Sequence, residues 1–195
     1  MQFFYFKTGF VSVNTYIVYN PQTMRGFVID PGGNYKRIIK ETADMGVTLS
    51  AQLLTHGHFD HCGASAQLQK DGVKVYIHSL DADKLHSEGN GAAFFGVPFD
   101  TLTADYTFND GEVLNIEGIE VKVLHTPGHT SGSVCFIIEG KIFSGDTLFY
   151  MSIGRTDMFD GDGQKMKQSI KKLFALEGDY EVYPGHSGKT TLEFE

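Results

Sequence analysis

The sequence predicts an α/β protein built as a layered sandwich of strands and helices. Runs rich in aromatic and β-branched residues recur in both halves of the chain, and segments with the apolar spacing of an amphipathic helix follow them. Turns that contain glycine and histidine come directly after several of these runs. Because strands precede helices in both halves, the layered α/β class is favoured.

Two strands are predicted at the amino-terminal end, at residues 1–6 and, after a turn at Gly9, at residues 14–19. The first run does not have the features of an export signal, because no basic segment precedes it and Lys7 interrupts it. No apolar run approaches the ~20 residues that a membrane span needs. We therefore expect a cytoplasmic protein without membrane association.

Two β-α-β units are predicted next. In chain order we expect a strand at residues 26–30, a helix at 35–45, a strand at 51–55, a helix from about residue 64 that stops at Gly72, and a strand at 73–77. The helix over residues 35–45 is predicted from a helical recurrence of apolar residues that includes Ile38, Ile39 and Met45.

The second half returns to strands after a less regular stretch. A short helix near residues 80–85 and a loop rich in glycine and phenylalanine at 89–96 are expected first. Strands are then expected at residues 119–124, 133–138 and 141–143, a helix at 164–176 and a last strand at 180–183. Glu139 and Gly140 provide a hairpin turn between two of these strands.

Composition narrows the class of protein. The length of 195 residues suits a single domain over residues 1–195, and 41% hydrophobic with 21% charged residues excludes a disordered chain or a coiled coil. A formal net charge of -8 argues against nucleic acid and anionic membranes as partners. Two cysteines do not make a disulfide framework, which favours a reducing compartment.

A histidine-rich loop is the first candidate site. His56, His58, Asp60 and His61 follow directly on a predicted strand and precede a predicted helix. Two imidazoles at positions i and i+2 of an extended turn can point at one centre, and the next two side chains can point at a second centre nearby. Imidazole and carboxylate ligands suit zinc, iron or manganese, and the motif contains no thiolate.

Three more candidate ligands occur in the same context, each beside a turn at the end of a strand. They are His129 after a Pro-Gly turn, Asp146 after Ser144-Gly145, and His186 after Pro184-Gly185. Loops at one end of a sheet converge on one site in other α/β enzymes. The repetition of strand, glycine and ligand therefore predicts one shared metal site.

This pattern of motifs resembles the metallo-β-lactamase-fold superfamily over nearly the whole chain. The resemblance implies a four-layer αβ/βα sandwich with metal ions at the edge between two sheets. It also implies two divalent ions, with zinc favoured and iron or manganese as alternatives. One ion would be held by His56, His58 and His129 and the other by Asp60, His61 and His186, and Asp146 would bridge them.

Within that superfamily the chain looks most like compact glyoxalase II-type thioester hydrolases, through residues 144–149 and 154–157. Full-length members carry a C-terminal helical substrate domain that is not expected here, and they read Gly-His-Glu-Tyr-Thr where this chain has Gly-His-Ser-Gly-Lys-Thr. The resemblance implies cleavage of a small acidic thioester or ester, S-lactoylglutathione-like, by a metal-bridging hydroxide.

Two residues are assigned roles in that reaction. Asp60 would orient the attacking water and accept its proton. Arg155 would anchor a substrate carboxylate through its planar guanidinium, with an ordinary ion pair as the alternative role. The rival function is that of a persulfide dioxygenase of the same fold, with a single iron on His56, His129 and Asp146.

Overall fold

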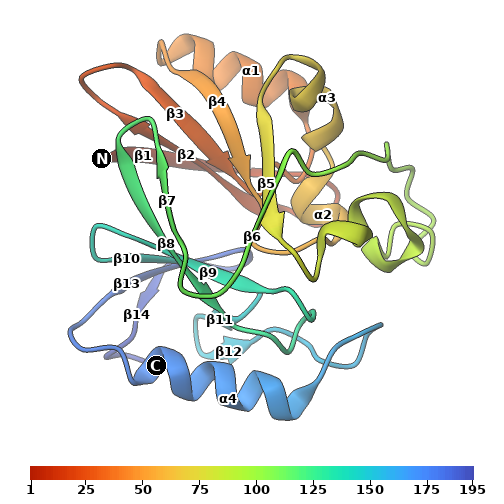
Figure 1. Cartoon of the computed structure of the whole chain (residues 1–195), viewed down its shortest axis with the longest axis vertical. Helices are drawn as coiled ribbons and strands as arrows, with labels where there is room; N and C mark the ends of the chain where they lie inside the picture. The colour runs from red at the N-terminus through yellow and green to blue at the C-terminus, as the bar shows by residue number, and fades with distance from the viewer.

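The computed structural model describes residues 1–195 as two β-sheets packed face to face, with helices on both outer faces. In Figure 1, α1 and α3 cover the upper sheet and α4 covers the lower one. The helices are α1 (Tyr35–Asp44), α2 (Phe59–Cys62), α3 (Ser65–Lys70) and α4 (Gly163–Phe174), with 3₁₀ turns at Ala82–His86 and Glu88–Asn90. The predicted four-layer α/β sandwich is confirmed.

The first sheet contains the amino-terminal strands in sequential order. They are β1 (Gln2–Thr8), β2 (Val13–Asn20), β3 (Arg25–Ile29), β4 (Thr48–Leu53), β5 (Lys74–His78) and β6 (Tyr106–Phe108). β1, β2 and β3 pair in antiparallel fashion, whereas β3 to β6 run parallel. Parallel neighbours require crossover connections, which α1 and the α2–α3 segment supply on the outer face.

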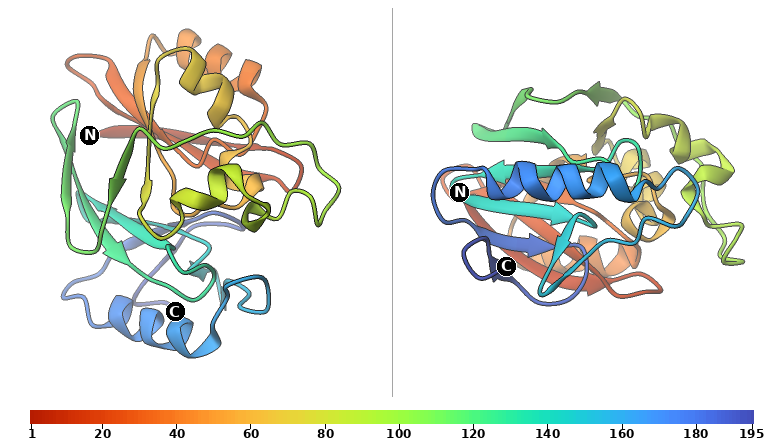
Figure 2. Two further views of the ribbon diagram at one scale, coloured as in Figure 1. Left: turned by 45° about the vertical axis from the view of Figure 1, so that its right-hand side comes forward. Right: turned by 90° about the horizontal axis from the view of Figure 1, so that it is seen from below.

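The second sheet is mainly antiparallel. Its strands, in spatial order, are β14 (Thr190–Thr191), β13 (Glu181–Pro184), β10 (Lys141–Gly145), β9 (Val134–Ile138), β8 (Ile119–His125) and β7 (Val113–Ile116). A separate pair of short strands is formed by β11 (Leu148–Phe149) and β12 (Ser152–Ile153). β10 and β13 run parallel because α4 connects them across the outer face. Figure 2 shows α4 over this sheet and the segment between β5 and β6 projecting from one edge.

The largest apolar cluster lies between the two sheets. It contains 16 buried residues, among them Phe27 and Phe108 from the first sheet and Phe136 and Phe143 from the second. Burying each phenyl ring contributes about 1.5–3 kcal/mol to folding. Smaller clusters lie between each sheet and its helices. The inner faces of the sheets are thus held rigidly, and the loops at their edges are anchored to that core.

Some sequence predictions were wrong in detail. The helix at residues 35–45 is present, but it buries Ile38 and Thr42, while Ile39 and Met45 are exposed. The apolar residues therefore cover more of the helix surface than the face that is buried. The edge strands β6 and β7 and the terminal strand β14 were not predicted, because they are short and bury few apolar side chains. None of the helices has the length and apolar character that crossing a membrane requires.

Candidate metal centre

The histidines and aspartates singled out in the sequence meet at one edge of the sandwich. They follow the ends of strands from both sheets: β4 leads into the first histidine loop and α2, and β8, β10 and β13 each lead into one further ligand loop. The side chains brought together in this way are His56, His58, Asp60, His61, His129, Asp146 and His186.

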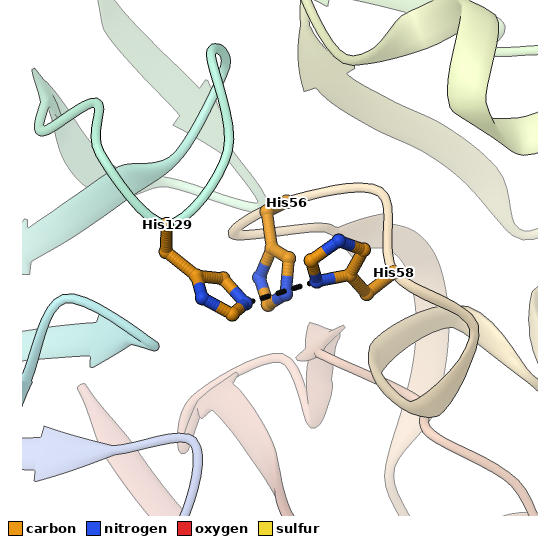
Figure 3. Close-up of side chains that lie close together, drawn as sticks. All are labelled: His56, His58 and His129. Atoms are coloured by element: carbon orange, nitrogen blue, oxygen red, sulfur yellow. Dashed lines mark hydrogen bonds between the residues drawn. The ribbon is translucent and has the colours of Figure 1, made fainter. Parts of the chain in front are cut away.

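The first group, hereafter the first trio, consists of His56, His58 and His129. All three side chains are buried, and their nearest nitrogens lie within 4.8 Å of one another. Nδ1 of His58 is 2.9 Å from Nε2 of His129, across the gap between two loops of different sheets (Figure 3). Figure 3 shows the three rings pointing toward one another.

The second trio consists of Asp60, His61 and His186, whose ligand atoms also lie within 4.8 Å. Oδ2 of Asp60 is 3.3 Å from Nε2 of His186 and 3.8 Å from Nε2 of His61. Asp60 and His61 are adjacent in α2, and His186 arrives from the end of β13.

Asp146 lies between the two trios. Its Oδ1 is 3.2 Å from Nε2 of His61, and its Oδ2 is 3.5 Å from Nε2 of His129. Gly185 makes this position possible, because a Cβ there would lie 2.5 Å from Oδ1 of Asp146 and 2.5 Å from Cε1 of His61. One carboxylate thus faces both groups of ligands.

The donor atoms fit metal ions. Nε2 of His56, Nε2 of His61 and Oδ1 of Asp146 are buried and form no hydrogen bond, although the last two atoms lie 3.2 Å apart. Such burial is costly unless another ligand satisfies these atoms. Burial lowers the pKa of His58 to about 4 and also lowers the pKa of His56, so both imidazoles have a free lone pair at neutral pH. A nitrogen and oxygen donor set without thiolate suits zinc, iron or manganese.

The carboxylates are ionised as metal binding requires. Burial alone would raise the pKa of Asp146, but His61 and His129 lower it below its usual range. The pKa of Asp60 is also lowered, because His61 and His186 outweigh the effect of burial.

Asp30 supports the second trio and was missed by the sequence analysis. Its Oδ2 accepts a hydrogen bond from Nδ1 of His61 at 2.8 Å, and its two oxygens accept from the backbone N–H and hydroxyl of Thr55 at 2.8 and 2.7 Å. Thr55 in turn hydrogen-bonds Nδ1 of His56 at 3.1 Å. This arrangement leaves Nε2 of His61 as the atom that faces the centre. The signal in the sequence was the position of Asp30 directly after β3, because the proposed ligands also follow the ends of strands.

Asp81 connects the loops of the first trio and was also missed. Its side chain is fully buried and accepts hydrogen bonds from the backbone N–H of Gly57, the hydroxyl of Thr130 and the backbone N–H of Gly132, each at 2.8 Å. The ammonium of Lys84 lies 3.0 Å away. Gly57 lies between two histidine ligands and Thr130 follows the third, so Asp81 fixes the spacing of these loops.

Arg155 contacts the centre through its backbone, whereas its side chain is paired elsewhere. Its backbone carbonyl accepts a hydrogen bond from Nδ1 of His129 at 2.8 Å. Its guanidinium donates two hydrogen bonds to Asp157, at 2.7 and 3.0 Å, and the side chain is 54% exposed. The charge that the sequence analysis assigned to a substrate is therefore paired within the chain.

The remaining histidines lie outside the centre. His78 is buried, and its ring stacks on His125 with centroids 4.3 Å apart and an angle of 11° between the planes. His125 donates from Nε2 to the carbonyl of Ser131 at 2.9 Å, within the loop that carries His129. His86 is exposed.

A cavity of about 220 Å³ opens over the two trios. Ligand side chains form its base, and apolar side chains form much of its wall. The lining residues are Phe10, Val11, His58, Phe59, Asp60, Asn90, Gly91, Phe95, His129, Asp146, Arg155, Met158, Phe159 and His186.

Comparison with known proteins agrees with this geometry. A family model described as the Metallo-beta-lactamase superfamily matches residues 8–186. The chain is 40% identical over 173 residues to the hydroxyacylglutathione hydrolase GloC of Haemophilus influenzae, covering 85% of this chain and 81% of that protein. It is similar in structure to the BLEG-1 B3 metallo-beta-lactamase, with a TM-score of 0.94, 34% identity, and 99% and 95% of the two chains covered. It is also similar in structure to TTHA1623 in a di-iron-bound form, with a TM-score of 0.88, 32% identity, and 98% and 96% of the two chains covered.

Proposed function

This chain belongs to the metallo-beta-lactamase superfamily, and on that premise we propose that it is a glyoxalase II-type hydrolase of small acidic thioesters or related esters. The family and the clustered His and Asp side chains support a metal-dependent hydrolase. The name of the Haemophilus influenzae relative, hydroxyacylglutathione hydrolase, supports the thioester as the substrate class.

The observation that carries the proposal is the pair of trios that share Asp146 at the base of an open cavity. We propose that His56, His58 and His129 hold one ion and that Asp60, His61 and His186 hold the other, with Asp146 as a ligand of both. Zinc is the proposed metal, and the di-iron form of TTHA1623 makes iron the main alternative. When bound, two such ions would lower the pKa of a shared water and polarise the substrate carbonyl.

The chain's own residues would prepare this reaction. With one oxygen facing His186 at 3.3 Å, Asp60 has a second oxygen with which to orient a water and accept its proton. Asp30 holds His61 in one tautomer, and the carbonyl of Arg155 does the same for His129. For the guanidinium of Arg155 to bind a substrate carboxylate, it would have to leave Asp157.

Cytoplasmic localisation is part of the proposal. Cys62 and Cys135 are both buried and unpaired by a disulfide. Free thiols in a domain of this size fit a reducing compartment.

The test is a paired assay on one metal-quantified preparation. We expect two ions per chain and hydrolysis of S-lactoylglutathione, and we expect His58→Ala and His61→Ala to abolish that activity. His86→Ala is the matched control, since His86 is exposed outside the centre, and it should retain full activity. A single iron, an active His61→Ala variant and oxygen uptake with glutathione persulfide would instead establish the dioxygenase function. A β-lactam substrate serves as a specificity control because of the similarity to BLEG-1.

A further inference from the structure

Three phenylalanines from three separate loops surround the cavity and are largely exposed. Phe10, Phe95 and Phe159 are 80%, 48% and 52% exposed, yet all three line the cavity. An apolar ring that stays in water contributes little to folding. Exposed apolar surface gathered around a concave site marks a ligand-binding surface.

Phe159 is the most informative of the three because its backbone is strained. Its φ of 43° lies in the left-handed region, which non-glycine residues rarely adopt. The ring lies 6.2 Å from the ring of His58 and 6.2 Å from that of Phe94. Gly91 leaves room for it, since a Cβ there would be 3.2 Å from the ring. Strain combined with exposure is typical of a functional position.

The cavity offers little to a highly charged ligand. Apart from the histidines of the two trios, Arg155 is its one basic lining residue, and it is paired with Asp157. The nearby ammonium of Lys84 is taken up by Asp160 at 2.8 Å and Asp81 at 3.0 Å. Apart from the proposed metal ions, a substrate with several carboxylates would therefore find at most one side-chain cation, and only after that cation exchanged partners.

The size of the cavity sets the size of the group that it can hold. A dry apolar cavity of about 150 Å³ is sufficient to bind benzene. The volume of about 220 Å³ here can accommodate one aromatic ring together with the thioester group to be cleaved.

We propose that the rim formed by Phe10, Phe95 and Phe159 selects thioesters in which one arm is apolar and about the size of an aromatic ring. The arm can be the acyl group or the thiol. The inference rests on the proposed thioester hydrolase function and narrows its substrate class: S-lactoylglutathione, which lacks such an arm, should be cleaved more slowly than a thioester that has one. In the reaction, one water adds to the carbonyl carbon, the C–S bond breaks, and a carboxylate, a thiol and a proton are released.

The experiment compares two series of thioesters on the metal-loaded protein. The first varies the acyl group, acetyl against phenylacetyl, on the uncharged thiol N-acetylcysteamine. The second keeps the acetyl group and varies the thiol, methyl against benzyl. In at least one series the aromatic member should have a kcat/KM about tenfold or more above that of its short partner. The series that shows the preference identifies the arm.

Phe159→Asn tests the rim itself. Asparagine tolerates the left-handed backbone and removes the ring, so the aromatic-to-short ratio of kcat/KM should fall about tenfold. A general disturbance of His58 would lower both rates and leave the ratio unchanged. Phe174→Asn is the matched control, because Phe174 is similarly exposed. It is the last residue of α4, which covers the outer face of the second sheet, and it does not line the cavity. Phe10→Ser provides a second rim variant.

Binding of inert thioethers separates this inference from the proposed function. Calorimetry with S-benzyl- and S-methyl-N-acetylcysteamine should show tighter binding of the benzyl compound, reduced in Phe159→Asn. If no thioester is cleaved but this preference is present, the proposed function fails and the selectivity of the rim stands. An aromatic-to-short ratio of kcat/KM of about one in both series, where the inference predicts about tenfold, would overturn the inference. Rim variants that change the oligomeric state but neither ratio would overturn it as well.

Discussion

Replacing Asp81 should both destabilise the protein and weaken metal binding by the first trio. Asp81→Ala would leave the buried backbone N–H groups of Gly57 and Gly132 without their acceptor, at about 1–3 kcal/mol each. It would also remove one partner of the buried ammonium of Lys84, whose other partner, Asp160, remains. Because these effects share one site and do not add fully, we expect a loss of about 4 kcal/mol in the free energy of unfolding.

The assay is urea unfolding of metal-free protein, with the free energy taken by linear extrapolation and an unchanged m-value as the sign of a two-state loss. Asp83→Asn is the control, because Asp83 is 84% exposed on the same turn and should change stability by less than about 0.5 kcal/mol. A loss below about 1 kcal/mol for Asp81→Ala would refute the reasoning, since it would mean that the Asp81 hydrogen bonds do not hold the loops.

Asp81 should also affect metal binding unequally. Its contacts are to the loops of His56, His58 and His129 and not to those of the second trio. Metal titration of Asp81→Asn should therefore show about 10–100-fold weaker binding at one of two sites. Equal weakening of both sites would contradict the role assigned to Asp81.

Three further outcomes are expected. Asp30→Ala should weaken metal binding about 10–100-fold at the site formed by the second trio, measured by competition with a chromophoric chelator, and unchanged affinity would contradict its role. Gly185→Ala should displace Asp146 and lower metal stoichiometry without unfolding the domain, as followed by metal analysis and circular dichroism. Burial alone would raise the pKa of Asp160, but its hydrogen bonds to Lys84 and Ser131 lower it to about 2. Its contribution to stability is thus present above the unfolded pKa of about 3.9 and is lost as the pH falls through 2, and Asp160→Asn should flatten that part of the stability curve.

The proposed ligands could be found in the sequence because they repeat one local pattern. Each follows a strand-like run and a turn, and His56, His58, Asp60 and His61 are close enough in sequence to be noticed together. The strands that carry them are buried and strongly patterned, so the layered fold was also accessible.

The supporting residues could not be found in this way. Asp81 is one aspartate in an irregular turn, and its partners Thr130 and Gly132 lie about fifty residues further along the chain. The burial of His78 could not be predicted for the same reason, since its ring stacks on His125 from the other sheet. Contacts of this kind arise from the docking of the two sheets, which no local spacing encodes.

The division of the ligands between the two sheets has a mechanical consequence. The first trio joins the loop after β4 to the loop after β8, and the second trio joins α2 to the end of β13. Bound ions would link the two sheets at the open edge of the sandwich, and their binding energy would oppose separation of the sheets there. After a chelator removes the ions, proteases should therefore cleave the chain first at this edge. The aromatic core at the centre should still hold the two sheets together at that stage.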